Sequence, residues 1–176
     1  MRLSEHVILG GGAAAALTPV LGAPDSLIFF ASSVLIDVDH YWDYLQRNEF
    51  RDWSWRKTFE FHRAMFAKVH APDFLGLNLF HTAEWFVTVW MAGAWLGSSA
   101  LFAVLFGMAY HLVLDVAFLA RHGVTFKRAL SVIEYHVRRA RLVRGGLDPD
   151  RPYSEALIEI GVEREPDPAA EGQVSS

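Results

Sequence analysis

Four stretches of the chain are almost entirely apolar, and the segments between them carry most of the charge. The apolar stretches are residues 7–23, 27–36, 74–97 and 101–120. In the last of them, His111 and Asp115 are the only charged or imidazole side chains among twenty residues. A helix needs about 20 apolar residues to cross the hydrocarbon core of a bilayer. The pattern therefore predicts an all-α integral membrane protein, a helical bundle of about four spans.

The first two stretches differ in character. Residues 7–23 are rich in Gly and Ala, which let helices approach closely in a membrane, so this span is expected to pack against protein. Residues 27–36 are too few for an ordinary span. We expect this second helix to continue through Asp37 and Val38, or to tilt into a region where the bilayer is locally thin.

Two of the charged segments have the pattern of amphipathic helices. From Ser54 onward, apolar residues recur at helical spacing, with basic residues on the opposite face; the apolar positions are Trp55, Phe59, Met65, Phe66 and Val69. Such a helix is typical of a membrane interface. A second, C-terminal basic helix is predicted after Arg121, with its apolar side at Leu130, Ile133 and Val137.

The composition changes again at Gly145. From there the chain is rich in Pro, Gly, Glu and Ser, a composition that favours disorder. We therefore expect a helical membrane domain over residues 1–144 and a mostly disordered cytoplasmic tail over residues 145–176. At most one short helix is expected in the tail, near Glu155 to Ile160.

The basic residues predict the orientation of the bundle. Two short turns, residues 23–26 and 97–100, contain no Lys or Arg, and all 16 Lys and Arg fall on the other side of the predicted membrane. By the positive-inside rule, both termini and residues 41–73 are cytoplasmic. A soluble helical bundle is the alternative, because two of the apolar stretches are short.

Composition narrows the chemistry. The net charge of -4 provides no field that attracts nucleic acid, so no nucleic-acid partner is predicted. The chain has no Cys, so any metal ion must be held by His, carboxylate or water. The N-terminus resembles a signal peptide, but Glu5 and His6 interrupt its polar start and further apolar stretches follow. We interpret it as a retained first span.

Ionisable side chains gather at one depth of the predicted bundle. Near the cytoplasmic ends of the four helices lie His6, Asp37, Asp39, His40, His81, Glu84, His111 and Asp115. Several are three or four residues apart, as His81 and Glu84 are, so that each pair shares one face of a helix. Ionisable groups within a membrane are costly unless something engages them, which makes a shared functional site the first hypothesis.

Clusters of His and carboxylate on facing helices are typical of metal sites in bundles. The candidate ligands are His6, Asp37, Asp39, His62, His81, His111 and Asp115, enough for one divalent ion or two. Zn²⁺ and Mn²⁺ are expected first: Zn²⁺ suits the histidines, whereas Mn²⁺, Mg²⁺ or Fe suits an oxygen-rich site. A metal ion with an open position activates water to hydrolyse an ester or phosphoester. Glu84 or Asp39 is the expected general base.

Simpler interpretations exist for the individual residues. Taken alone, His111 is as consistent with a packed, hydrogen-bonded residue as with a metal ligand. Taken with Asp115, it is also consistent with a pair in which the Asp carboxylate orients the imidazole by accepting its other N–H. Asp37 and Asp39 alone are typical of helix caps or solvated interfacial charges. His62 reaches the site only if the interfacial helix lies over the bundle; otherwise it is a surface residue, as is His70. The joint placement favours a metal site.

The order of the motifs resembles that of a known family. The motifs are a His opening a Gly/Ala-rich span at His6, D-x-D-H at Asp37 to His40, H-R at His62 and Arg63, H-T at His81 and Thr82, and H-L-x-L-D at His111 to Asp115. This set resembles the bacterial membrane-bound metal-dependent hydrolase family, which includes a LexA-regulated inner-membrane protein. It is distantly similar to the zinc-dependent phospholipase C group.

The resemblance implies a metal centre and a hydrolase in the bacterial cytoplasmic membrane. Together with the residues, it leads us to expect hydrolysis of a phosphoester or related ester, on a lipid-like substrate drawn from the membrane. Basic interfacial segments would attract anionic head groups of membrane lipid. The alternative is a non-catalytic membrane protein in which the same residues form a structural metal clip or an ion-binding site.

Overall fold

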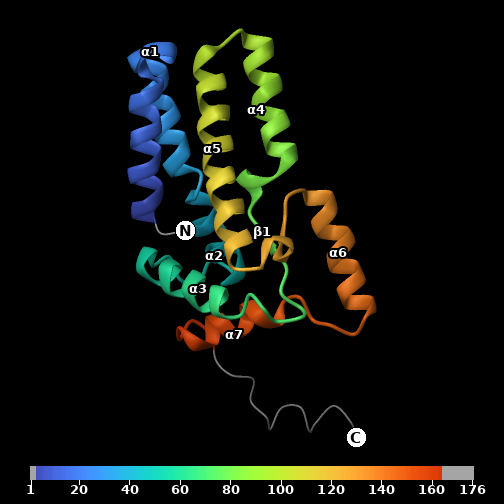
Figure 1. Ribbon diagram of the computed structural model, residues 1–176. Coiled ribbons are helices and arrows are strands. Elements are labelled where there is room, and N and C mark those ends of the chain that lie inside the picture. Colours follow the sequence, from blue (N-terminus) through green and yellow to red (C-terminus); the bar gives the residue numbers. More distant parts are fainter. Residues whose placement is uncertain (1–2, 164–176) are drawn as a thin grey trace, which may run out of the picture.

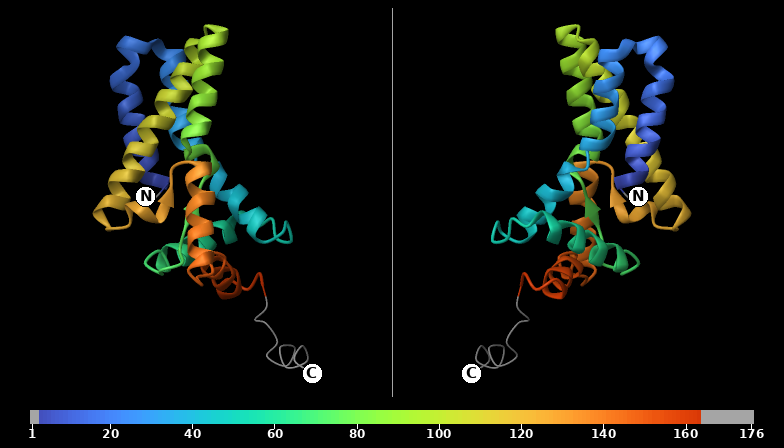
Figure 2. Two further views of the ribbon diagram at one scale, coloured as in Figure 1. Left: turned by 90° about the vertical axis from the view of Figure 1, so that its right-hand side faces the viewer. Right: turned by 90° about the vertical axis from the view of Figure 1, so that its left-hand side faces the viewer.

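The computed structural model describes residues 3–163, which are mostly helical. Figure 1 and Figure 2 show two layers: an elongated bundle made of α1, α4 and α5, and a smaller layer at one end of it made of α2, α3, α6 and α7. We call this smaller layer the base. The N-terminal end of α1 lies where the bundle meets the base.

The helix α1 (Leu3–Leu35) is a hairpin of two arms. Gly22 has φ 76 and ψ 161, a conformation open to glycine and strained for other residues, and it reverses the chain (Figure 1). The arms pack closely, because a Cβ atom on Gly10 would lie only 2.5 Å from Ser33 Oγ. The two arms correspond to the first two apolar stretches, with the reversal just before Pro24.

The helices α4 (Ala83–Leu96) and α5 (Ser99–Arg121) form a second hairpin. Gly97 ends α4 in the left-handed conformation, and the Ser98 side chain caps α5 by accepting a hydrogen bond from the Leu101 amide. The turn between the two arms of α1 and the turn between α4 and α5 lie at the same end of the bundle, away from the base (Figure 1). α5 contacts the second arm of α1 so closely that a Cβ atom on Gly107 would lie 2.3 Å from the Phe29 carbonyl oxygen.

The base has an apolar core of its own. It comprises α2 (Val38–Arg47), α3 (Trp55–Ala67), α6 (Val132–Arg144) and α7 (Arg151–Glu159). The core joins α2, α3 and α7 through Tyr44, Leu45, Phe61, Ala64, Met65, Tyr153, Ala156 and Leu157. Arg151 at the start of α7 donates two hydrogen bonds, of 2.7 and 2.8 Å, to the buried carboxylate of Asp73.

The structure describes residues 145–163 of the predicted tail, and the short helix expected near Glu155 to Ile160 is present there as α7. Residues 151–159 form a helix because Tyr153, Ala156 and Leu157 fall on one face and are buried against α2 and α3. The rest of the expected tail, residues 164–176, lies outside the described residues.

A short parallel strand pair connects the second half of the chain to the segment before α4. In it β1 (Gly76–Leu77) pairs with β2 (Arg128–Ala129), Gly76 opposite Arg128. The 3₁₀ turns η1 (Leu79–His81) and η2 (Thr125–Lys127) lie beside these strands. The third apolar stretch, 74–97, therefore becomes helical only at Ala83, and the predicted basic helix begins only at Val132.

Two helical stretches are long and apolar enough to cross a membrane by length and composition. They are Leu3–Arg47, which includes both arms of α1, and Ser99–Arg121. Only 22% and 28% of their most apolar windows are buried within the protein. The core helix of a soluble protein would be mostly buried, so this low burial favours membrane association.

Replacing Gly107 by Ala is expected to destabilise the bundle. The added Cβ atom would stand 2.1 Å from Ser32 Oγ and 2.3 Å from the Phe29 carbonyl oxygen, and overpacking of this kind costs about 1–3 kcal/mol. Gly12→Ala is the matched control, because a Cβ atom there meets nothing within 4 Å. Thermal unfolding in detergent measures both variants, and a Gly107→Ala variant as stable as the control would contradict the close contact.

Candidate metal centre

Four side chains from different parts of the chain converge where the bundle meets the base. Asp37, His81, His111 and Asp115 each offer one ligand atom, and these atoms all lie within 4.8 Å of one another. Both histidines are fully buried and Asp115 is 7% exposed, while Asp37 is partly exposed. A buried set of two imidazoles and two carboxylates could hold a divalent metal ion.

The four ligand atoms form a ring in which carboxylate and imidazole alternate. His111 Nε2 lies 3.2 Å from Asp37 Oδ1 and 3.5 Å from Asp115 Oδ2. His81 Nε2 lies 3.8 Å and 3.9 Å from the same two oxygens. Two ligands at about 2.1 Å from a tetrahedral zinc ion are about 3.4 Å apart. The ring is thus close to the size that a tetrahedral metal site requires.

Hydrogen bonds on the far sides of the histidines set their tautomers. His111 Nδ1 lies 2.8 Å from the carbonyl oxygen of Ser33, which can only accept, so this nitrogen carries the proton. His81 Nδ1 lies 2.9 Å from Asp39 Oδ2 and donates to that carboxylate. In its neutral form, each imidazole therefore presents an unprotonated Nε2 to the ring, as a metal ligand must.

The two Nε2 atoms are buried and have no hydrogen-bond partner within residues 3–163. Asp37 Oδ1 is close to His111 Nε2, but a proton-free nitrogen has nothing to donate to it. A buried polar atom left without a partner costs about 1–3 kcal/mol. A divalent ion would supply a partner for both nitrogens, and the two carboxylates would balance its charge, so the residues present fit such an ion.

The local fold explains how these side chains meet. Asp37 occupies the junction between α1 and α2, and His81 lies in η1 just before α4. The close contact of Gly107 with α1 brings α5 near enough for His111 to reach the Ser33 carbonyl. Four residues further along α5, Asp115 projects from the same face as His111.

Asp39 lies behind His81, outside the ring of four. Its Oδ2 accepts hydrogen bonds from His81 Nδ1 and from the Phe80 amide at 3.1 Å, and its Oδ1 lies 2.9 Å from His40 Nδ1. These contacts join α2 to η1. The geometry supports a role for Asp39 in orienting His81, in place of the expected roles of ligand and general base.

His6 reaches the ring from the first arm of α1. Its Nε2 lies 3.3 Å from Asp115 Oδ1, and its ring stacks on that of His111 with the centroids 3.9 Å apart. The buried Nδ1 of His6 has no hydrogen-bond partner in the described part of the chain. This expected ligand therefore adjoins the four donors but is not one of them.

Glu84 is held at the start of α6. Its carboxylate accepts a 2.6 Å hydrogen bond from the Ser131 hydroxyl and a 3.1 Å bond from the Val132 amide. A carboxylate at this position satisfies free amides at the positive end of the helix dipole. The structure does not bring Glu84, expected as a general base, to the ring.

His62 also lies outside the ring, although α3 does approach the site. Its Nε2 donates a 2.8 Å hydrogen bond to the carbonyl oxygen of His40. Burial lowers the pKa of the His62 imidazole to about 3, so the ring is neutral near pH 7. His62 contacts the segment that carries Asp37 and Asp39, and it offers no atom to the four-donor set.

One residue at the site was not predicted from the sequence. Arg128 on β2 donates a 2.9 Å hydrogen bond from Nη1 to Asp115 Oδ2, the oxygen that belongs to the ring. In the sequence Arg128 is one of nine Lys and Arg from Arg121 onward, and nothing in its spacing distinguishes it. Only the pairing of β2 with β1 brings it to this place.

Comparison with known proteins found no matching family model, no similar curated protein and no similar solved structure. The resemblance drawn from the motifs thus stays a prediction, and the chemistry of this centre is inferred from its geometry.

Asp39→Asn is expected to lower metal affinity by about tenfold to a hundredfold, because the carboxylate that orients His81 and favours its Nδ1 proton is lost. Glu84→Gln is the matched control: it also neutralises a carboxylate, but one that contacts α6. The control should keep its metal affinity and unfold at a lower temperature than the wild type. Titration of chelator-treated protein with Zn²⁺ measures the affinities, and equal affinities for the two variants would contradict the assignment.

Proposed function

We propose that this chain is a membrane-embedded, metal-dependent hydrolase that acts on a phosphoester or related ester with a lipid-like part. The observation that carries the proposal is the ring of Asp37, His81, His111 and Asp115, with two buried Nε2 atoms aimed into it. A divalent ion held there with one further coordination position open to solvent would activate water and polarise the ester group. Asp37 is the more exposed of the two ring carboxylates and is the residue placed to accept a proton from water.

A bundle of four spans fits the outer surface of the two hairpins. Large apolar side chains on both arms of α1 and on α4 and α5 are exposed, among them Val20 at 80%, Leu27 at 67% and Trp95 at 88%. Exposure of so much apolar surface to water would be energetically unfavourable and would favour aggregation. The two reversals carry no Lys or Arg, so the base is proposed to lie in the cytoplasm.

The helix lengths bear on how the bundle fits a bilayer and on how deep the site lies in it. α5 has 23 residues, about 34 Å, whereas α4 has 14, about 21 Å. The bilayer would have to thin around the shorter helices. His111 and Asp115 lie ten and six residues before the end of α5, so the ring is recessed by about 9–15 Å from the cytoplasmic end of that helix.

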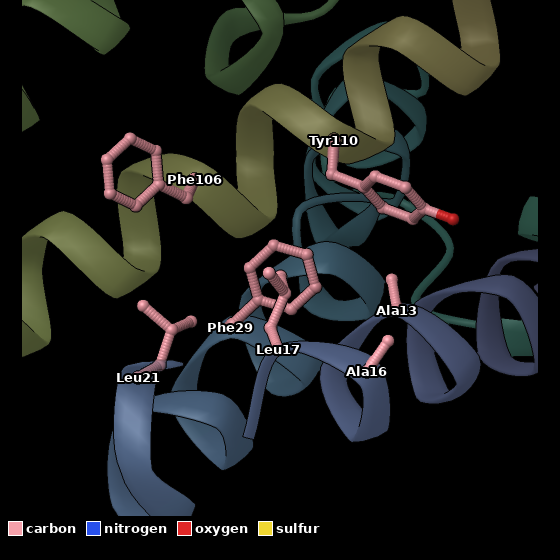
Figure 3. A pocket seen from close by; sticks show the side chains of 7 residues that line it. All are labelled: Ala13, Ala16, Leu17, Leu21, Phe29, Phe106 and Tyr110. Atoms are coloured by element: carbon pink, nitrogen blue, oxygen red, sulfur yellow. The ribbon is translucent and has the colours of Figure 1, made fainter. Parts of the chain in front are cut away.

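An apolar groove supports a substrate with an acyl chain. The groove has a volume of about 580 Å³ and lies between the first arm of α1 and α5, beside Phe29 (Figure 3). It is lined by Ala13, Ala16, Leu17, Leu21, Phe29, Phe106 and Tyr110. Tyr110 precedes the ring residue His111 on α5, so one end of the groove lies at about the depth of the metal centre. A hydrocarbon chain in the groove would place a polar head group toward the ring.

The site is tested by measuring the metal content of purified protein in detergent. Asp37→Ala and His111→Ala each remove one ring ligand and are expected to lose most of the bound metal. Asp43→Ala, a nearby carboxylate on α2 that pairs with Arg47, is the control and should retain it. Full metal in both ring variants would contradict the shared site.

Hydrolysis is tested separately on the metal-loaded protein. We expect it to cleave bis(p-nitrophenyl) phosphate or a long-chain alkyl p-nitrophenyl phosphate, and to lose this activity on chelation. Bound metal with no hydrolysis of either compound would favour a structural metal clip over an enzyme.

Filling the groove should affect only substrates with long chains. Ala16→Trp places a large side chain in the groove, whereas Ala15→Trp changes an exposed neighbour that does not line it. Each CH₂ group excluded from an apolar site costs about 0.8 kcal/mol, so the first variant should raise KM for the long-chain compound at least several-fold. An equal effect of both variants, or of Ala16→Trp on the short compound, would contradict a chain-binding groove.

A further inference from the structure

Arg128 lies at the metal centre, and within residues 3–163 only one of its three guanidinium nitrogens, Nη1, has a hydrogen-bond partner. Its Nη1 donates to Asp115 Oδ2, and this same oxygen lies 3.5 Å from His111 Nε2 and 3.9 Å from His81 Nε2. The side chain is 11% exposed. The guanidinium group is therefore packed directly against the ring of ligands.

The opposite edge of the guanidinium group has no partner. Nε and Nη2 of Arg128 are buried, and neither has a hydrogen-bond partner among residues 3–163. These two N–H groups point in parallel and form the fork that binds two oxygens of one carboxylate or phosphate. Leaving charged donors buried and unpaired is costly, so this edge is suited to an oxyanion that enters with a ligand.

The chain holds Arg128 in this position from several sides. Gly76 and Leu77 of β1 pair with Arg128 and Ala129 of β2. On the next residue along, the Leu130 carbonyl accepts a 2.8 Å hydrogen bond from the Ala83 amide at the start of α4. Glu84 accepts hydrogen bonds from the Ser131 hydroxyl and the Val132 amide, which holds the chain just after β2. The strand pairing thus fixes the backbone of Arg128, and the hydrogen bond to Asp115 positions its guanidinium group.

The charges around the site sum to zero when one divalent ion is bound. Asp37, Asp39 and Asp115 balance one divalent ion together with Arg128. An anion brought by a ligand would face the cation and the free edge of Arg128 together. A lysine at this position would offer a single point charge, whereas the arginine fork fixes two oxygens and hence the orientation of the group.

We infer that the Nε–Nη2 edge of Arg128 binds the phosphoryl oxygens of the substrate and orients the phosphoryl group beside the metal centre. The choice of a phosphoryl group rests on the proposed function, whereas the binding of an oxyanion rests on the free edge alone. Because the product of such an enzyme keeps these oxygens, inorganic phosphate serves as the probe.

The test is phosphate binding to the full-length protein in detergent, by calorimetry, with and without Zn²⁺. Arg128→Gln should weaken phosphate binding by about tenfold to a hundredfold, the usual effect of losing charge-assisted hydrogen bonds. Arg128→Lys should recover only part of the affinity, because it restores the charge but not the fork. Arg121→Gln is the matched control: it removes one positive charge from an exposed position at the end of α5 and should bind phosphate as the wild type does.

Several outcomes separate this inference from the proposed function. Wild-type protein that binds no phosphate at millimolar concentration overturns the inference, as does an Arg128→Gln variant that keeps wild-type affinity. If Arg128→Gln does not fold, as judged by its circular dichroism, Arg128→Lys decides: unchanged affinity overturns the role of the fork. Arg128-dependent phosphate binding without hydrolysis of any phosphoester would support the anion site and contradict the enzyme.

Discussion

Two hydrogen bonds at the junction of bundle and base determine what the centre can do. One runs from His111 Nδ1 to the Ser33 carbonyl oxygen and the other from His81 Nδ1 to Asp39. Each keeps a proton on Nδ1, so that Nε2 of the neutral ring faces the carboxylates.

Both hydrogen bonds depend on how the surrounding helices pack. Ser33 reaches His111 only because α5 and the second arm of α1 touch at Gly107 and Phe29, where no larger residue than glycine fits. On the other side, the Phe80 amide and His81 both bind Asp39, so η1 is attached to the first turn of α2. Small residues in the bundle and polar contacts in the base thus act together on one site.

Part of this arrangement could be predicted from the sequence. The spacing of His111 and Asp115 placed both on one face of a helix, and the distribution of Lys and Arg separated the ends of the bundle. His81 and Glu84 were expected to share a helix face in the same way. They do not, because Thr82 begins a new helix between them and His81 belongs to a 3₁₀ turn. A spacing of three residues indicates a shared face only where one helix continues through both.

Other features depend on contacts that leave no local pattern. Arg128 reaches the site through a two-residue strand pair with β1, which lies some fifty residues earlier in the chain. The helix α7 was expected only as a short helix near Glu155 to Ile160. Burial of Tyr153 and Leu157 against α2 and α3 stabilises it, and it begins already at Arg151. In both cases tertiary contacts decide the structure.

The central claim is that the Nε2 atoms of two histidines and the oxygens of two aspartates bind one metal ion. X-ray absorption spectroscopy of the Zn²⁺-loaded protein in detergent tests it most directly, because imidazole ligands give a distinctive outer-shell scattering. We predict a first shell of nitrogen and oxygen at about 2.0–2.1 Å with two imidazoles per zinc. A zinc ion surrounded only by oxygen, or no zinc retained at all, would contradict a metal centre built from these four residues.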